Sequence, residues 1–335
     1  EELEEIILTQ RCFNTFCAFV VPQAYRHRYP PVYQALWREL TDATLNNEEF
    51  NFEKYAISGS RGFIKTFLLK MLTLYVIMFT QRKTLIVVGS EEGKAKDFIS
   101  DVWSALASPN VIAMYGNRDR TVESDTRTEK IFWYNGRKLS LAAYGAGQSL
   151  RGTQVDYARP DLIIMDDLLD LEDTDTPLKF DRLKRWLTAT ALEAMSKYNY
   201  VAVYLGNMYP KNCLTTFLVN SPNWKSIRIS PILADGSLLW PEVMPLHVLQ
   251  DKFAQAERDD TLASFYAEVM NMPIGSAEGL LDFGKILPVP DEEFHDYHLG
   301  NYVVIDPAGH KATSDANAIG YYEIYEDLSG NTDVA

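Results

Sequence analysis

The sequence predicts an α/β fold in which a mainly parallel sheet carries helices on both faces. Apolar runs rich in β-branched residues end in a small or acidic residue near 89, 166 and 206. Helical patterns separate these runs, which is the order expected of successive βαβ units. The chain is also large enough for such a core, with 335 residues of which 47% are hydrophobic and 23% charged.

The charge balance limits how the chain can meet nucleic acid. The formal net charge is −14, which argues against a broadly basic coat but leaves room for a local basic groove. Two clusters are candidates for such a groove, Arg182 with Lys184 and Arg185, and Arg118 with Arg120.

The cysteines and the longest apolar run favour a cytosolic protein without a membrane span. Cys12, Cys17 and Cys213 have no metal-binding spacing and are expected to be buried, reduced thiols. The run 63–79 contains two lysines, so it predicts a buried helix.

The first chemical motif follows a predicted helical region, 1–50, and a short strand, 54–57. It reads Gly-Ser-Arg-Gly-Phe-Ile-Lys-Thr over 59–66 and opens the apolar helix. A strand, a glycine-containing turn and Lys-Thr at a helix start are the layout of a phosphate-binding loop. We expect the N–H groups of residues 60–66 to point into one concavity, Lys65 to reach the β- and γ-phosphates, and Thr66 to hold Mg²⁺. Ile64 stands where the usual pattern has a second glycine, and its Cβ limits how closely a phosphate can approach.

The segment after this loop predicts a parallel unit with an antiparallel addition. A buried strand at 84–89 is followed by Ser90, which is expected to cap the next helix. Residues 131–141 predict a hairpin on a type I′ turn at Asn135-Gly136.

Two later strands end in polar residues that suit hydrolysis. The strand that begins at Leu162 ends in Asp166 and Asp167, where the first carboxylate can hold Mg²⁺ and the second can orient or deprotonate water. The strand 200–205 leads to Gly206-Asn207, where an amide can sense a γ-phosphate. The prediction is therefore an ATP site with Mg²⁺.

The remaining chain contains a segment rich in proline and glycine, with predicted regular structure on both sides of it. A strand at 224–229 and a helical stretch at 241–266 precede a segment broken by proline and glycine. A fresh strand then ends in Asp306, with Asp315 following. We expect a nucleotide-binding domain at 1–270, a linker at 271–295 and a further domain at 296–335. Within the first domain we expect a helical N-terminal part at 1–50, a core at 51–235 and a helical subdomain at 236–270.

The order of these motifs resembles the large subunit of tailed-bacteriophage terminases. The motifs that carry the resemblance are residues 60–66, 85–92, 149–152, 159–167, 205–207 and 305–308. The resemblance implies a P-loop NTPase of the RecA-like, additional-strand type, followed by the start of a ribonuclease-H-like nuclease domain. It implies a motor that hydrolyses ATP to translocate double-stranded DNA into a prohead and an endonuclease that cuts concatemeric DNA.

The resemblance also implies roles for individual residues. Asp167 would be the catalytic carboxylate, Arg61 an arginine finger, and Asn207 part of the motif that couples hydrolysis to DNA movement. Asp167 stands where many members have Glu. The residues implied to bind nucleotide and its metal are Gly59, Ser60, Arg61, Gly62, Phe63, Ile64, Lys65, Thr66 and Asp166.

For the nuclease, the resemblance implies Asp306 and Asp315 as ligands of Mg²⁺ or Mn²⁺. The chain stops before the family's other nuclease carboxylates, so we expect this site to be incomplete. The implied partners are DNA, the portal protein of the prohead and the small terminase subunit, with no membrane. Several copies of the chain would form a ring when docked on the portal, and whether the chain is a monomer in solution is left open. The chain would act in the host cytoplasm and would not be retained in the virion.

Two alternatives remain open at this stage. A superfamily 2-type DNA translocase or helicase would need a second RecA-like domain, which residues 224–335 do not suggest. A non-hydrolysing nucleotide-binding scaffold is supported by Ile64 alone.

Overall fold

The computed structural model describes residues 6–63, 65–116, 122–150, 157–169, 177–209, 213–233 and 235–272, and the backbone of three strands beyond residue 297. The chain divides into two compact units, Glu1–Ile274 and Gly275–Ala335.

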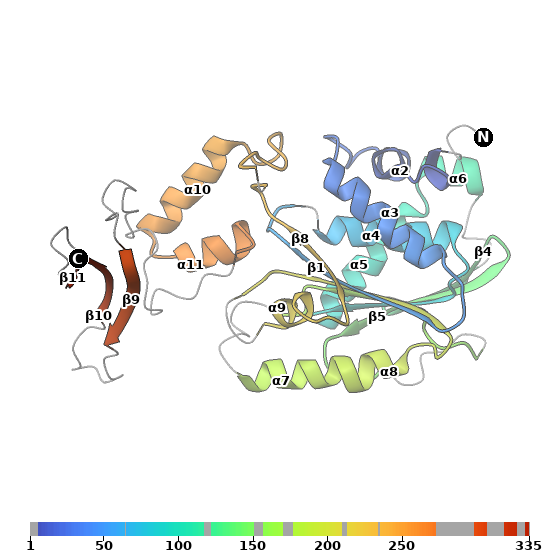
Figure 1. The fold of residues 1–335 in the computed structure, drawn as a ribbon. Helices are drawn as coiled ribbons and strands as arrows, with labels where there is room; N and C mark the ends of the chain where they lie inside the picture. The colour runs from blue at the N-terminus through green and yellow to red at the C-terminus, as the bar shows by residue number, and fades with distance from the viewer. Residues whose placement is uncertain are drawn as a thin grey trace. The chain divides into compact units, whose positions relative to one another are not determined.

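The first unit is built on one eight-stranded sheet (Figure 1), and its strands follow the order β3-β4-β5-β2-β6-β7-β1-β8. The neighbouring strands β5-β2-β6-β7-β1-β8 are all paired in parallel, and β4 and β3 add antiparallel pairs at the β5 edge. β7 lies between β1 and β6, which is the additional-strand arrangement, so the α/β fold predicted for this unit, with a mainly parallel sheet, is confirmed. The strands are β1 (Asn51–Gly59), β2 (Thr84–Gly89), β3 (Val122–Asp125), β4 (Glu129–Tyr134), β5 (Arg137–Gly145), β6 (Leu162–Asp166), β7 (Asn199–Gly206) and β8 (Lys225–Ile229).

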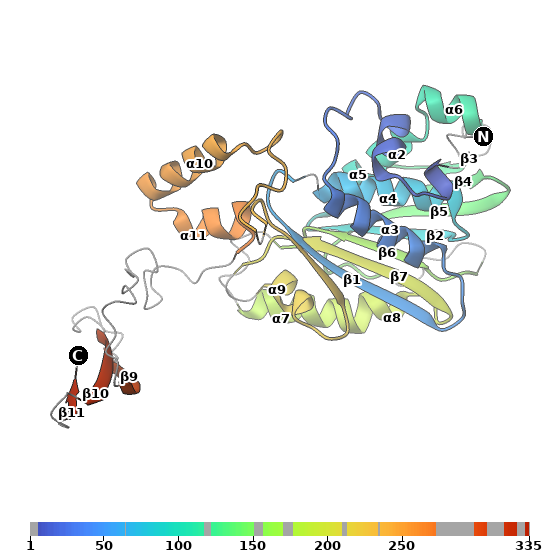
Figure 2. The same cartoon turned by 45° about the horizontal axis from the view of Figure 1, so that its top comes forward.

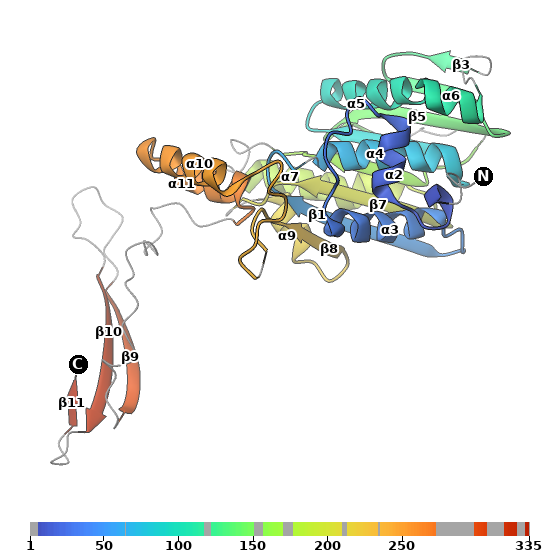
Figure 3. The ribbon, with the colours of Figure 1, turned by 90° about the horizontal axis from the view of Figure 1, so that it is seen from above.

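Helices cover both faces of this sheet (Figures 2 and 3). Neighbouring strand residues point to opposite faces, so Ile57 and Ala56 belong to different hydrophobic clusters, as do Val87 and Ile86. The helices of one face are α2 (Phe13–Val20), α3 (Pro31–Leu45), α4 (Lys65–Phe79), α5 (Glu92–Ala105) and α6 (Pro109–Tyr115). The helices of the other are α7 (Pro177–Trp186), the π-helical η3 (Leu187–Ala191), α8 (Leu192–Ala194) and α9 (Leu214–Val219).

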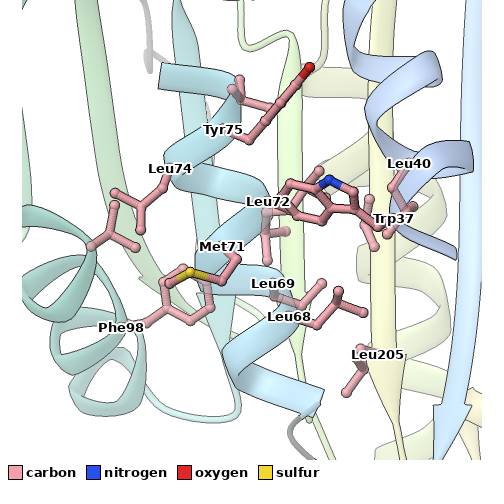
Figure 4. Packing of buried hydrophobic residues seen from close by; sticks show 14 of the residues in the cluster. Trp37, Leu40, Leu68, Leu69, Met71, Leu72, Leu74, Tyr75, Phe98 and Leu205 are labelled. Carbon is pink, nitrogen blue, oxygen red and sulfur yellow. The ribbon is translucent and has the colours of Figure 1, made fainter. Parts of the chain in front are cut away.

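The apolar helix α4 lies at the centre of the larger cluster. Its side chains pack toward Trp37 of α3 on one side and Phe98 of α5 on the other (Figure 4). Leu69, Leu72 and Tyr75 have no exposed surface. The predicted buried helix is therefore confirmed, and among the described residues no helix is long and apolar enough to cross a membrane.

The predicted hairpin is also present. Asn135 and Gly136 join β4 to β5 with φ of 48° and 73°, and two positive φ values define a type I′ turn.

Three local predictions differ from the structure. Helix α5 begins at Glu92, no side chain caps it, and the Ser90 hydroxyl is buried without a partner among the described residues. The region 1–50 is only partly helical, because residues 21–30 form turns and irregular backbone. Cys12 is half-buried, whereas Cys17 and Cys213 are buried, and all three are free thiols.

The C-terminal part of the first unit is helical, with α10 (Leu246–Arg258), α11 (Leu262–Ser264) and the π-helical η4 (Phe265–Val269). The second unit contains an antiparallel sheet in the order β11-β10-β9, made of β9 (His298–Asp306), β10 (Ala318–Glu326) and β11 (Thr332–Val334). The predicted strand that ends in Asp306 is thus part of β9. Asp315 lies outside the described residues.

Candidate active site

The polar ends of four strands meet at the carboxyl edge of the parallel sheet. The strand register aligns Gly89 of β2 with Asp166 of β6, Asp166 with Leu205 of β7, and Gly206 with Ser58 of β1. Open α/β sheets bind their ligands at this edge, because the loops after the strands converge there. The described residues of the motifs at 59–63, 65–66, 166–167 and 207 therefore lie at the same edge of the sheet.

The loop between β1 and α4 depends on its two glycines. A Cβ on Gly59 would lie 3.0 Å from Cδ of Lys65, so the glycine lets the lysine side chain pass close to the end of the strand. Gly62 has a φ of +87°, a conformation that residues with a side chain rarely adopt. The Tyr33 hydroxyl of α3 donates to the Phe63 carbonyl at 3.0 Å and ties the loop to the helical layer. Ile64 lies outside the described residues.

The backbone of this loop differs from the expected phosphate cradle. The N–H of Ser60 donates to the Ile229 carbonyl at 3.3 Å, and that of Phe63 to the Ser60 carbonyl at 3.3 Å. The N–H of Arg61 donates to the Glu268 carbonyl at 2.6 Å. The prediction that every N–H from 60 to 66 points into one concavity is therefore wrong for these three residues in this structure. Their donors are satisfied by other parts of the chain.

Thr66, in the first turn of α4, lies beside Asp166, since its side chain is among the groups that lower the pKa of that carboxyl. Burial raises the pKa of the Asp166 carboxyl to about 6, and the neighbouring Asp167 adds to the rise, while the Thr66 side chain and the charges of Lys65 and Lys70 oppose it. Oδ1 of Asp166 is buried without a hydrogen-bond partner in the described part of the chain.

These oxygen donors fit a magnesium ion. A buried carboxylate oxygen without a partner is costly, and a cation beside it would remove that cost. Mg²⁺ is usually held by one or two carboxylates together with substrate phosphates. Asp166 with the Thr66 hydroxyl matches this requirement, whereas the described residues contain no cluster of three or more His, Cys, Asp or Glu side chains that could hold a metal by themselves.

Asp167 is placed by an unusual backbone conformation. Its φ is 50°, in the left-handed region that Asp and Asn adopt more readily than most residues. Its N–H donates to the Leu205 carbonyl at 2.8 Å, which fixes the turn against the end of β7. Its negative charge raises the pKa of both Asp166 and Lys65, so Asp167 lies within electrostatic range of both.

Lys65 and Asn207 are brought together across the loop. Nζ of Lys65 donates to Oδ1 of Asn207, whose residue is 5% exposed. Burial raises the pKa of the Tyr209 hydroxyl, and the nearby Asn207 side chain opposes the rise. Burial lowers the pKa of Lys65, and the charges of Asp167, Asp166 and Glu268 oppose this. Lys65 is thus held where a bound phosphate would compete with the Asn207 amide oxygen as the acceptor of the lysine's hydrogen bonds.

Arg61 is bound to Glu268, although its charge lies within electrostatic range of Lys65 and Asp167. Its guanidinium donates to Oε2 of Glu268 at 2.6 Å, and its side chain is 73% exposed. The structure therefore brings together Lys65, Thr66, Asp166, Asp167 and Asn207, and holds Arg61 at the margin through Glu268.

A cavity of about 320 Å³ opens beside these residues, between the first turns of α4, the end of β2 and α5. It is lined by Thr66, Lys70, Val87, Val88, Gly89, Lys94, Ala95, Asp97, Phe98, Asp166 and Asp167.

Sequence reasoning missed Lys70, although it follows Thr66 by four positions on the same helix face. It also missed Tyr209 and Glu268, for which no local signal exists.

Solved structures with a similar fold include bacteriophage large terminases. The ATPase domain of the Thermus phage P74-26 large terminase, as a point mutant, is 10% identical with a TM-score of 0.48, over 77% of this chain and 98% of its own. The large terminase of a second, thermophilic bacteriophage is 11% identical with a TM-score of 0.44, over 96% of this chain and 67% of its own.

The Phi-28 gp11 DNA packaging motor is 14% identical with a TM-score of 0.35, over 88% of this chain and 80% of its own. No protein-family model and no curated protein matches the chain. At these identities and TM-scores, the function has to be inferred from the chain's own residues.

Proposed function

We propose that this chain is the ATP-hydrolysing motor subunit of a viral DNA-packaging terminase. One observation carries the proposal: Lys65, Thr66, Asp166, Asp167 and Asn207 converge at the carboxyl edge of an additional-strand sheet. The arrangement provides a lysine for phosphate, oxygen ligands for a metal, a second carboxylate for water and an amide as a sensor.

In this proposal each residue has a defined task. Thr66 and Asp166 hold Mg²⁺, which when bound neutralises charge on the phosphate oxygens of ATP. Lys65 exchanges its bond to Asn207 for a bond to the β- and γ-phosphates. Asp167 orients the attacking water and accepts its proton. Asn207, released by Lys65, registers whether the γ-phosphate is present.

The partner on which the motor acts is proposed to be double-stranded DNA, and helix α7 is the surface that fits it best. In a chain of net charge −14, α7 carries four basic residues and one acidic residue, Asp181. Arg182 and Arg185 are exposed, while Leu183 and Trp186 anchor the opposite side in the core. The other candidate cluster, with Arg118 and Arg120, lies outside the described residues.

We expect the double substitution Arg182→Gln and Arg185→Gln to weaken DNA binding. Each phosphate contact contributes about 0.9 to the slope of log K against log salt concentration, so loss of both lowers the slope by about 2. DNA-stimulated ATP hydrolysis falls accordingly, while hydrolysis without DNA is unchanged. Fluorescence anisotropy with a labelled duplex at several salt concentrations measures the slope.

The matched control is Lys252→Gln with Arg258→Gln, which removes the same charge from exposed positions of α10. An equal loss of slope in both double variants would mean that net charge, and not α7, governs DNA binding.

The remaining parts of the proposal concern the assembled motor. The second unit is proposed to begin a ribonuclease-H-like endonuclease, with Asp306 at the end of β9 as a ligand of Mg²⁺ or Mn²⁺ together with Asp315. The proposed partners are the portal protein of the prohead and the small terminase subunit, with ring assembly on the portal in the host cytoplasm.

A further inference from the structure

Helix α9 is fastened to the segment that carries Asn207. Sγ of Cys213, the residue before the helix, donates to the Asn207 carbonyl at 3.5 Å and accepts the N–H of Tyr209 at 3.4 Å. The Thr216 hydroxyl of α9 donates to the Tyr209 carbonyl at 2.9 Å. The backbone of Asn207, whose side chain accepts the bond from Lys65, is therefore held by α9.

Helix α9 also packs tightly on the end of β7. A Cβ on Gly206 would lie 2.6 Å from the Thr215 hydroxyl oxygen, so only glycine fits between the helix and the strand. The same hydroxyl forms a hydrogen bond with the Tyr204 hydroxyl at 3.0 Å, and both side chains are buried. Because a close-packed contact transmits displacement, a shift of α9 also moves the segment 206–209.

The outer side of α9 meets α7 through Phe217 (Figures 1 and 2). Nζ of Lys184 lies 4.0 Å from the centroid of the Phe217 ring, and the Phe180 ring packs edge-on against it with 6.1 Å between the centroids. Phe217 is 36% exposed, whereas Leu214 and Leu218 of the same helix are buried. A ring and a charge that solvent can reach thus join the two helices.

Lys184 lies in the same turn of α7 as the two basic residues proposed to meet DNA. These residues, Arg182 and Arg185, are exposed. A DNA phosphate at this turn would compete with the Phe217 ring for the ammonium group, because a full negative charge attracts a cation more strongly than the quadrupole of an aromatic ring does.

We propose that α9 transmits DNA binding at α7 to the Lys65–Asn207 bond, with Phe217 as the positioning residue on which α7 acts. The inference rests on the proposed function, because it requires DNA at α7 and ATP at Lys65. Without DNA, Lys184 lies over Phe217, and α9 holds Asn207 where it accepts the Lys65 bond. With DNA, Lys184 leaves the ring, α9 shifts together with residues 206–209, and Lys65 is released for phosphate.

The substitution Phe217→Leu tests this link, because it keeps an apolar side chain and removes the ring that attracts Lys184. We expect kcat for ATP hydrolysis without DNA to rise about two- to fivefold, the factor that an exposed cation–π contact supplies. The rate at saturating DNA should stay unchanged, so the stimulation by DNA falls by the same factor. DNA should bind more tightly by a similar factor, because no contact has to be broken first. Phosphate release measures the rates, and fluorescence anisotropy with a labelled duplex measures the affinity.

Two further variants isolate the contact. Lys184→Met should raise the DNA-free rate in the same way, and adding Phe217→Leu to it should raise the rate no further, since both act on one contact. Phe253→Leu is the matched control, because Phe253 of α10 is also 36% exposed and its ring packs against another ring, that of Phe265. This control should leave the rates with and without DNA unchanged.

The outcomes separate this inference from the proposed function. If DNA stimulates hydrolysis but Phe217→Leu leaves the DNA-free rate unchanged or lowers it, α9 is not the link, while the nucleotide site stands. A rise of the same size in Phe253→Leu would overturn the link as well. If the unmodified chain hydrolyses no ATP, or hydrolyses it without any response to DNA, the proposed function fails and this inference fails with it.

Discussion

Substitution of Asp167 by Asn is expected to lower kcat for ATP hydrolysis by about a hundredfold or more while leaving nucleotide affinity nearly unchanged. Asn keeps the size of the side chain and adopts the left-handed conformation that residue 167 requires, at φ 50°. It lacks the negative charge that, in the proposed function, orients water and accepts its proton, a contribution of roughly 10²–10⁴ in rate. Steady-state phosphate release gives kcat, and calorimetry with ATP-γ-S gives the affinity.

The comparison variant is Lys65→Ala, for which the opposite pattern is expected. In the proposed function Lys65 exchanges Asn207 for phosphate, so its loss should weaken nucleotide binding itself. If Asp167→Asn turns over ATP at the normal rate while still binding it, another group must activate the water.

Replacing Arg82 by Met is expected to give the largest loss of stability in the chain outside the site. Arg82 is 2% exposed and donates to the carbonyls of Thr44, Ala43, Asn46 and Asp161, at 2.8 to 3.3 Å. It joins the end of α3 to the start of β2 and to the residue before β6. Removing one partner of a buried, charged hydrogen-bond network typically lowers the free energy of unfolding by about 3–5 kcal/mol, because the carbonyl acceptors are left without donors.

Urea denaturation measures this change, with Lys83→Met as the control. Lys83 is the exposed neighbour, and its substitution should alter the free energy of unfolding by about 0.5 kcal/mol or less. A similar small effect at both positions would show that the Arg82 bonds are replaced by water or by other groups.

The site residues that could be predicted from the sequence are those marked by a pattern of neighbouring residues. Apolar strands that end in Asp166 or Gly206, and a glycine loop that opens a helix, each carry their signal within a few positions. Once the strands are parallel, their carboxyl ends share one edge, so the convergence of Thr66 with Asp166 follows from topology. The Asn135-Gly136 turn was predictable for the same local reason.

The residues that the sequence could not locate act over long separations. Glu268 and Asn271 meet the phosphate loop across 207 and 213 positions of the chain, and in a helical pattern a Glu resembles any solvated residue. Contacts of similar range explain why the expected phosphate cradle was wrong for Ser60 and Arg61, because the N–H groups of these two residues donate to carbonyls that only the folded chain supplies. Ser90 failed as a cap since the chain turns into α5 one residue later.

The most direct test of the central claim is phosphate release from ATP with Mg²⁺, measured with and without linear double-stranded DNA. A site in which Lys65, Thr66, Asp166 and Asp167 act together predicts release that requires Mg²⁺, rises with DNA and disappears in Asp167→Asn. Two results would contradict the claim that this edge of the sheet is the catalytic centre of a DNA-stimulated ATPase. One is phosphate release that persists without Mg²⁺ or in Asp167→Asn, and the other is no release although ATP is bound.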